Sequence, residues 1–166
     1  MELFLVRHGK AFDADATRWP DDTERPLSPE GEEEFRRAAK RLGQLNPAVE
    51  MVFCSPLLRA RQTAAILEAQ AEWPAASLSE ALGGGRPEDV LASLAPFADT
   101  HSIGLVGHNP FLAWTVSLLI AGTVHADIKM GTGSVAHLSV HDLRAGAGTL
   151  VGLHQSSDLS ANDRHF

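Results

Sequence analysis

The sequence lacks the features of a secreted or membrane-spanning protein. Its 166 residues include one cysteine, Cys54, so no disulfide can form within the chain. No apolar stretch approaches the roughly 20 residues that a helix needs to cross a bilayer. The apolar run over Glu2–Val6, which opens the chain, is too short for a secretory signal. We therefore expect a cytoplasmic protein that has no membrane partner.

An excess of basic residues is missing as well. The chain carries 14 Lys and Arg against 21 Asp and Glu, which gives a formal net charge of −7. A domain this acidic is poorly suited to nucleic acids or to anionic membrane surfaces. An anionic ligand would have to be attracted locally, by a few well-placed arginines.

The pattern of apolar residues predicts a single α/β domain over residues 1–166. A chain of this length fits one domain, since domains run to roughly 100–200 residues, and no repeat or linker divides it. Short apolar runs alternate with segments of helical periodicity, which favours a parallel sheet covered by helices on both faces. We expect a three-layer α/β/α sandwich around a mostly parallel mixed sheet, with one antiparallel strand near the C-terminal edge. The expected strands are 2–6, 49–54, 76–78, 103–106, 135–140 and 150–154; the expected helices are 29–45, 57–69, 87–94 and 111–121.

Capping residues mark the expected helix ends. Ser28 followed by Pro29 is a typical helix start, because serine caps free N–H groups and proline at the first position has no N–H to satisfy. Ser55-Pro56 and Asn109-Pro110 predict two further helix starts on the same grounds. Asn46-Pro47 is expected to end the first helix.

Polar residues whose side chains can react or bind a ligand follow three of the expected strands. The segments are Arg7–Ala11, Ser55–Ala60 and Gly107–Pro110. In parallel sheets the carboxyl ends of the strands meet at one edge, where ligands bind. We therefore expect these three segments to lie together, although they are far apart in the sequence.

Two histidines and two arginines at one point are suited to phosphoryl transfer. A guanidinium offers a planar fork of donors that matches two phosphate oxygens, so Arg7 and Arg59 are candidate phosphate ligands. Neutral imidazole can attack phosphorus directly, which makes His8 a candidate nucleophile. A second histidine, His108, could be protonated beside the phosphate and stabilise the oxygens as they gain charge. This chemistry needs no metal and no cofactor.

At these residues the sequence resembles the histidine phosphatase superfamily. The resemblance covers nearly the whole chain and rests on four blocks in order: Arg7-His8-Gly9, Arg25–Gly31, Cys54–Thr63 and Val106–Pro110. Lys10-Ala11 after the first block, and the short length, are similar to the small bacterial phosphohistidine phosphatases. The resemblance implies that His8 becomes phosphorylated and that Arg7, Arg59 and His108 complete the phosphate pocket.

For two further residues, Arg25 and Glu80, the sequence leaves two alternative roles open. Arg25 either approaches the pocket or fixes a loop by hydrogen bonds. Many superfamily members use a carboxylic acid to protonate the leaving oxygen of an ester, and Glu80 lies at about the right place for that role. The alternative is that Glu80 is a solvated residue at the edge of a loop.

Other chemistries fit the sequence less well. Tyrosine-type phosphatases have a cysteine and an arginine separated by five residues, whereas Cys54 is followed by arginines at positions 59 and 61. The remaining histidines share no metal-ligand spacing, so we expect no metal site; they are His101, His125, His137, His141, His154 and His165.

The sequence leaves the substrate open. By resemblance, the expected partner is a phosphorylated substrate, in particular a protein that carries phosphohistidine. The alternative is a phosphatase for small phosphoesters such as sugar or nucleotide phosphates. A mutase is less favoured because the chain has no long insertion to shield the phosphoenzyme from water. A binding adaptor that has lost turnover is less favoured because both His8 and His108 are present.

Overall fold

Six strands form one mixed sheet in the computed structural model, which describes residues 1–45 and 49–161. The order across the sheet is β3-β2-β4-β1-β5-β6. Strands β1 to β4 are mutually parallel, and β5 runs antiparallel to both β1 and β6. The strands are β1 (Glu2–Arg7), β2 (Met51–Cys54), β3 (Ser77–Leu78), β4 (Ser102–Gly107), β5 (Val135–Val140) and β6 (Gly148–His154).

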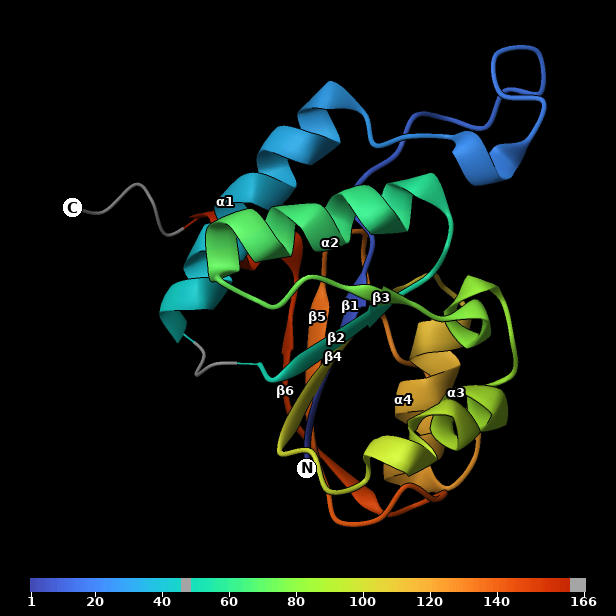
Figure 1. Ribbon diagram of the computed structural model, residues 1–166, viewed down its shortest axis with the longest axis vertical. Helices are drawn as coiled ribbons and strands as arrows, with labels where there is room; N and C mark the ends of the chain where they lie inside the picture. Colours follow the sequence, from blue (N-terminus) through green and yellow to red (C-terminus); the bar gives the residue numbers. More distant parts are fainter. Residues whose placement is uncertain (46–48, 162–166) are drawn as a thin grey trace.

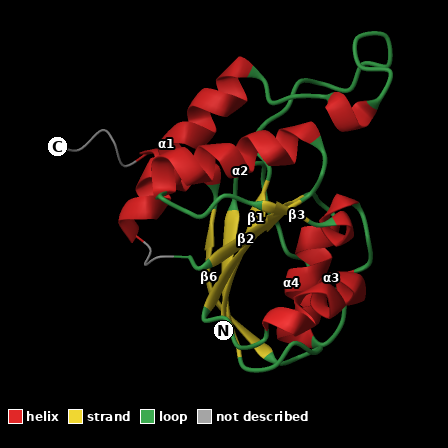
Figure 2. Ribbon diagram, in the orientation of Figure 1, coloured by secondary structure: helices red, strands yellow, loops and turns green. Residues whose placement is uncertain are grey.

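Helices cover both faces of this sheet, so the predicted α/β sandwich is confirmed. Figures 1 and 2 show α1 and α2 on one side of the strands and α3 and α4 on the other. Within the described residues, no helix is long and apolar enough to span a membrane. The helices are α1 (Pro29–Leu45), α2 (Leu58–Ala71), α3 (Pro87–Leu94), α4 (Phe111–Ala121) and the short α5 (Ser156–Ala161).

The first strand shows why the sheet is buried on both faces. Successive side chains of a strand point to opposite faces, so an apolar run without polar interruptions needs cover on both. Leu3 and Leu5 pack into the cluster that includes residues of α3 and α4. Phe4 and Val6 pack into the opposite cluster, with residues of α1 and α2. Strand β1 thus contributes side chains to two apolar cores, one on each face of the sheet.

The predicted helix caps are confirmed at one site and wrong at two. The Ser28 hydroxyl accepts a hydrogen bond from the Gly31 N–H at 3.0 Å and so caps α1. Helix α2 instead has Leu57 as its N-cap, and α4 has Pro110, neither with a side-chain cap. The side chains of Ser55 and Asn109 bind elsewhere, as described below. The predicted stop at Asn46-Pro47 lies outside the described residues.

Gly31 allows α1 to lie directly against the loop that follows β1. A Cβ atom built on Gly31 would lie 2.0 Å from the backbone oxygen of Lys10. Because both groups belong to backbone, neither can move aside as a flexible side chain would. The glycine of the Arg25–Gly31 segment therefore brings the start of α1 close to the loop that follows His8.

We predict that Gly31→Ala destabilises the protein by at least about 2 kcal/mol, because the added methyl group forces the helix off the loop. Helix propensity alone predicts the opposite sign, a gain of up to about 1 kcal/mol. Urea unfolding followed by circular dichroism measures the difference. Lys40→Ala, at an exposed position of the same helix, is the control. A stabilised Gly31→Ala would contradict the close contact.

Candidate active site

The strand register brings the three predicted segments together. Strand β4 lies between β1 and β2, and Arg7 is paired with Gly107 while Cys54 is paired with Val106. The three strands therefore end at nearly the same level of the sheet. The residues that follow them, including His8 after β1 and His108 after β4, emerge side by side at one edge.

His8 is held with one ring nitrogen free. Its Nδ1 lies 2.7 Å from the carbonyl oxygen of Gly9. A carbonyl can only accept a hydrogen bond, so Nδ1 carries the proton and the lone pair of neutral His8 is on Nε2. Gly9 is held in turn, because its N–H donates to the hydroxyl of the buried Thr63 at 3.0 Å. The ring is thus fixed in the tautomer that a nucleophile at Nε2 requires.

His108 lies beside His8 and is oriented by a buried serine. The two ring centroids are 5.0 Å apart. The Ser55 hydroxyl, which accepts from the Leu57 N–H, lies 2.7 Å from His108 Nε2. When this hydroxyl donates to Nε2, the proton of neutral His108 lies on Nδ1. Nδ1 is then a donor available to a ligand.

Both predicted phosphate-binding arginines are anchored by their terminal nitrogens. Arg7 Nη1 donates to the carbonyl of Met130 at 2.8 Å. Arg59 Nη1 donates to the backbone oxygen of Asp22 at 2.9 Å, and its Nη2 donates to the Asp22 carboxylate at 3.2 Å. These contacts hold each guanidinium in one orientation and leave its Nε uncommitted.

The buried polar atoms without a partner gather at this site. Across the described residues, four buried side-chain nitrogens or oxygens make no hydrogen bond: Arg7 Nε, Arg59 Nε, His108 Nδ1 and Asn109 Oδ1. Buried polar groups are nearly always paired, and leaving one unpaired costs about 1–3 kcal/mol. Three of the four belong to residues predicted to bind phosphate. Their nitrogens are the donors that an oxyanion would accept from.

The electrostatics of the site keep both histidines neutral. Burial, together with the positive charges of Arg59, Arg7 and Arg25, lowers the pKa of His8 to about 4, although the bond to the Gly9 carbonyl opposes the shift. Burial and the neighbouring charges of His8 and the arginines lower the pKa of His108 to about 3. A neutral His8 retains its lone pair at pH 7. An anion in the site would shift both values upward by its negative charge.

Arg25 makes the loop contacts of one of the two alternatives that the sequence left open, and its approach to the pocket stays a prediction. Its Nε donates to the Asp22 carboxylate at 2.7 Å and its Nη1 to the carbonyl of Phe12 at 2.6 Å, so it fixes the loop between them. Its charge also reaches the site, since it contributes to the lowered pKa of His8.

Glu80 and Cys54 are not brought into the histidine and arginine cluster by any direct contact. Glu80 begins a short 3₁₀ helix, η2 (Glu80–Gly83), which packs near the end of β4, but its side chain is exposed and makes no hydrogen bond or ion pair with a described residue. Its role as a proton donor therefore stays a prediction. Cys54 is buried in the core at the end of β2, and burial raises the pKa of its thiol.

Sequence reasoning missed three residues that organise the site: Asp22, Ser55 in its contact with His108, and Thr63. Ser55 and Thr63 fall inside the Cys54–Thr63 block, so a signal was present, but their partners are more than 50 residues away in the chain. Asp22 carries no sequence signal, because its link to Arg59 depends on how the loop folds back. No group of three or more metal-ligating side chains occurs in the part of the chain that is described.

Known proteins share this arrangement of fold and sequence. The sequence model of the histidine phosphatase superfamily (branch 1) matches residues 3–83. An uncharacterized protein of Picosynechococcus sp. is 39% identical over 129 residues, which are 75% of this chain and 77% of that protein. The structure of the protein histidine phosphatase SixA complexed with tungstate has a TM-score of 0.83 and 27% identity, covering 96% of this chain and 99% of that chain.

The chain belongs to the histidine phosphatase superfamily. Within it the chain is similar to SixA phosphohistidine phosphatases, as the sequence blocks predicted, and these neighbours support a phosphatase activity. The fold is also that of a mycobacterial glucosyl-3-phosphoglycerate phosphatase, with a TM-score of 0.71 and 20% identity over 93% of this chain and 98% of that one. The fold is therefore found with more than one class of phosphorylated substrate.

The lowered pKa values of His8 and His108 predict a pH-dependent stability. Between pH 6.5 and about 4, the unfolded chain binds protons at these histidines that the folded protein does not. Stability therefore falls as the pH drops through this window, by on the order of 3 kcal/mol per histidine, and is fully present above pH 6.5.

Urea unfolding of the wild type and of a His8→Gln/His108→Gln variant across this range isolates the contribution. The wild type should lose more stability on acidification than the variant. His101→Gln, which removes an exposed histidine, is the control. Parallel pH curves for wild type and double variant would show that the two buried histidines are not held neutral.

Proposed function

We propose that this protein is a metal-independent phosphatase that acts through a covalent phosphohistidine intermediate on His8, with phosphohistidine on a protein as its preferred substrate. The observation that supports this proposal most strongly is the environment of His8. The free Nε2 of a neutral His8 lies among unpaired donors of Arg7, Arg59 and His108. A nucleophile and a set of oxyanion donors are thus present in one site.

In the first step, the lone pair of His8 Nε2 attacks phosphorus. The bond from phosphorus to the leaving group breaks, and its electron pair leaves with that group. The phosphorylated His8 ring carries positive charge, because Nδ1 retains its proton. The Gly9 carbonyl accepts a hydrogen bond from that Nδ1–H, so it stabilises the ring in this charged state more than in the neutral one.

In the second step, a water molecule attacks the same phosphorus. The phosphorus–nitrogen bond breaks and its electron pair returns to Nε2, which restores neutral His8 with the proton still on Nδ1. The water contributes its hydroxyl group to the phosphate and one proton to solvent. Arg7, Arg59 and His108 donate to the equatorial oxygens as these gain charge in both steps. The arginines supply the positive charge, and no step requires a metal.

Phosphohistidine is favoured as substrate by the leaving group it would release. Imidazolium has a pKa near 6.5, so a phosphohistidine ring that carries a proton on its second nitrogen releases neutral imidazole without a strong acid beside it, whereas an alkyl ester releases a far more basic alkoxide. The exposed Glu80 makes no contact with the two histidines, which fits a site with little demand for a general acid. The similarity to SixA supports the same substrate class. The alternative remains a phosphatase for small phosphoesters, which the fold also accommodates.

We predict that acid-labile, alkali-stable phosphate appears on His8 during turnover. A phosphorus–nitrogen bond breaks once its nitrogen is protonated, whereas phosphoserine survives acid. The measurement is ³²P transfer from a phosphohistidine protein in excess EDTA, with an alkaline quench and mapping of the labelled peptide. His8→Ala should lose both label and activity, and His101→Ala should keep both. Label on Cys54 or on a serine would contradict the mechanism, and loss of labelling in EDTA would contradict metal independence.

Glu80→Gln distinguishes the two substrate classes, because it removes a proton donor and keeps the shape. If Glu80 is a general acid, the loss in kcat/KM should be on the order of 10²–10⁴-fold for alkyl phosphates and small for phosphohistidine and aryl phosphates. We expect the wild type to favour phosphohistidine and the variant to retain most of that activity. The matched control is Glu88→Gln, at an exposed position of α3. Fast wild-type hydrolysis of alkyl phosphates that is abolished in Glu80→Gln would favour the phosphoester alternative.

A further inference from the structure

A loop between β1 and α1 places one carboxylate among the arginines of the site. Short backbone pairing at its base, between Ala11 and Leu27, closes the loop, which projects from the body of the molecule in Figure 1. A 3₁₀ helix within it, η1 (Asp22–Glu24), packs near α2. Asp22 opens this short helix.

Asp22 is held by two arginines at once. Its carboxylate accepts from Arg25 Nε at 2.7 Å and from Arg59 Nη2 at 3.2 Å, and its backbone oxygen accepts from Arg59 Nη1 at 2.9 Å. Arg59 is buried, whereas the side chain of Asp22 is 56% exposed. The carboxylate therefore contacts the candidate phosphate-binding arginine, while more than half of the Asp22 side chain stays open to solvent.

The Asp22 carboxylate is ionised and its field reaches the reacting groups. The hydrogen bond from Arg25 is the largest of the effects that hold its pKa below the usual range, followed by the charges of Arg59 and Arg25. Its negative charge also acts on His108, where it opposes the lowering of the pKa by burial. An ionised carboxylate cannot donate a proton, so its effect on a substrate is electrostatic.

We propose that Asp22 is a specificity-determining residue, which favours substrates whose leaving group carries positive charge and disfavours phosphoesters that carry a second anion beside the phosphate. The proposal rests on the phosphatase function proposed above. A phosphorylated imidazole with a proton on its second ring nitrogen is such a substrate. When the phosphorus–nitrogen bond breaks, the electron pair goes to the substrate nitrogen, and the ring departs as neutral imidazole with that proton retained.

The contacts of Asp22 leave its carboxylate charge with an effect beyond that of a loop anchor. A loop anchor needs only hydrogen-bond acceptors, and the backbone oxygen of Asp22 already serves Arg59. The carboxylate adds a negative charge next to Arg25 and Arg59, which are positively charged. That charge opposes the binding of a second anion, while the arginines still bind the phosphate.

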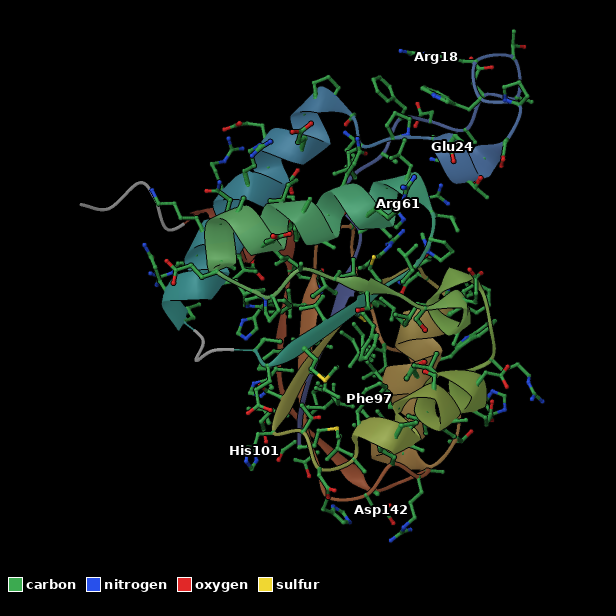
Figure 3. All side chains as sticks on the ribbon, viewed as in Figure 1. Arg18, Glu24, Arg61, Phe97, His101 and Asp142 are labelled. Atoms are coloured by element: carbon green, nitrogen blue, oxygen red, sulfur yellow. The ribbon has the colours of Figure 1, made fainter. Side chains whose placement is uncertain are left out.

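The experiment compares the binding of two phosphate compounds that differ in their second charge. Phosphoethanolamine carries an ammonium group and 3-phosphoglycerate carries a carboxylate. Titration calorimetry gives the Kd of each for the wild type, for Asp22→Asn and for Glu24→Gln. Glu24 lies in the same 3₁₀ helix and is labelled in Figure 3, on the projecting loop. It makes no side-chain contact with a described arginine, so it controls for the general charge of the loop.

We expect the wild type to bind phosphoethanolamine more tightly than 3-phosphoglycerate. Asp22→Asn should change the ratio of the two Kd values by about tenfold toward 3-phosphoglycerate. The interaction energy of two solvated unit charges a few ångströms apart corresponds to a change in Kd of about this size. Glu24→Gln should leave the ratio unchanged. Asp22→Glu, which retains the charge, should retain the preference even where the loop is disturbed. Turnover of phosphoimidazole should fall about tenfold in kcat/KM in Asp22→Asn relative to p-nitrophenyl phosphate.

Equal weakening of both compounds in Asp22→Asn would overturn the proposal and leave Asp22 an anchor for Arg59. An equal change of the ratio in Glu24→Gln, or a wild type with no preference, would overturn it as well. Because the Kd ratio and hydrolysis are separate measurements, a failure of the proposed phosphatase function is seen on its own, as absent hydrolysis of every phosphorylated substrate.

Discussion

The geometry of the site depends on the two hydrogen bonds of the Thr63 hydroxyl. This hydroxyl is fully buried, accepts from the Gly9 N–H at 3.0 Å and donates to the Arg59 carbonyl at 2.7 Å. One oxygen therefore joins the loop that follows His8 to the helix that carries Arg59. Gly9 in turn accepts from His8 Nδ1, so the tautomer of His8 depends on Thr63, which holds the loop through the Gly9 N–H. Residues at the start of α2 hold two further segments of the site in the same way. Gln62 accepts from the Leu27 N–H at 2.8 Å, and Ser55, just before the helix, contacts His108.

An acidic protein that binds an anion must concentrate positive charge against its own net charge of −7. The structure does so by placing a half-buried Arg7 and a buried Arg59 at one edge of the sheet, where desolvation lowers the pKa of each guanidinium but leaves it charged. Carbonyl oxygens and the Asp22 carboxylate offset part of the cost of burial. Burial and the same charges lower the pKa of His8, so a single arrangement is suited to an anion and keeps His8 neutral.

The limits of sequence reasoning are clearest at the helix starts. Ser28 behaves as the local pattern predicts, because its partner, the Gly31 N–H, is three residues away. Ser55 and Asn109 have equally good local patterns, yet Ser55 contacts His108 and Asn109 Nδ2 donates to the Met130 carbonyl at 2.9 Å. In both cases a distant partner in the buried site competes with the local cap. The composition and pattern of these segments carry no information about which partner prevails.

By itself, the sequence determined the alternation of strands and helices, the two-sided burial of the sheet and the identity of the motif residues at three strand ends. These follow from local periodicity and from the rule that parallel strands end at a common edge. Only the tertiary structure decided the free nitrogen of His8, the pairing of Ser55 with His108 and the place of Asp22 between Arg25 and Arg59. Each depends on groups separated along the chain that the closing of the sheet and the docking of α2 bring within hydrogen-bond reach. Such contacts are set by the packing of the whole fold, because hydrogen bonds require distances near 3 Å that no local pattern specifies.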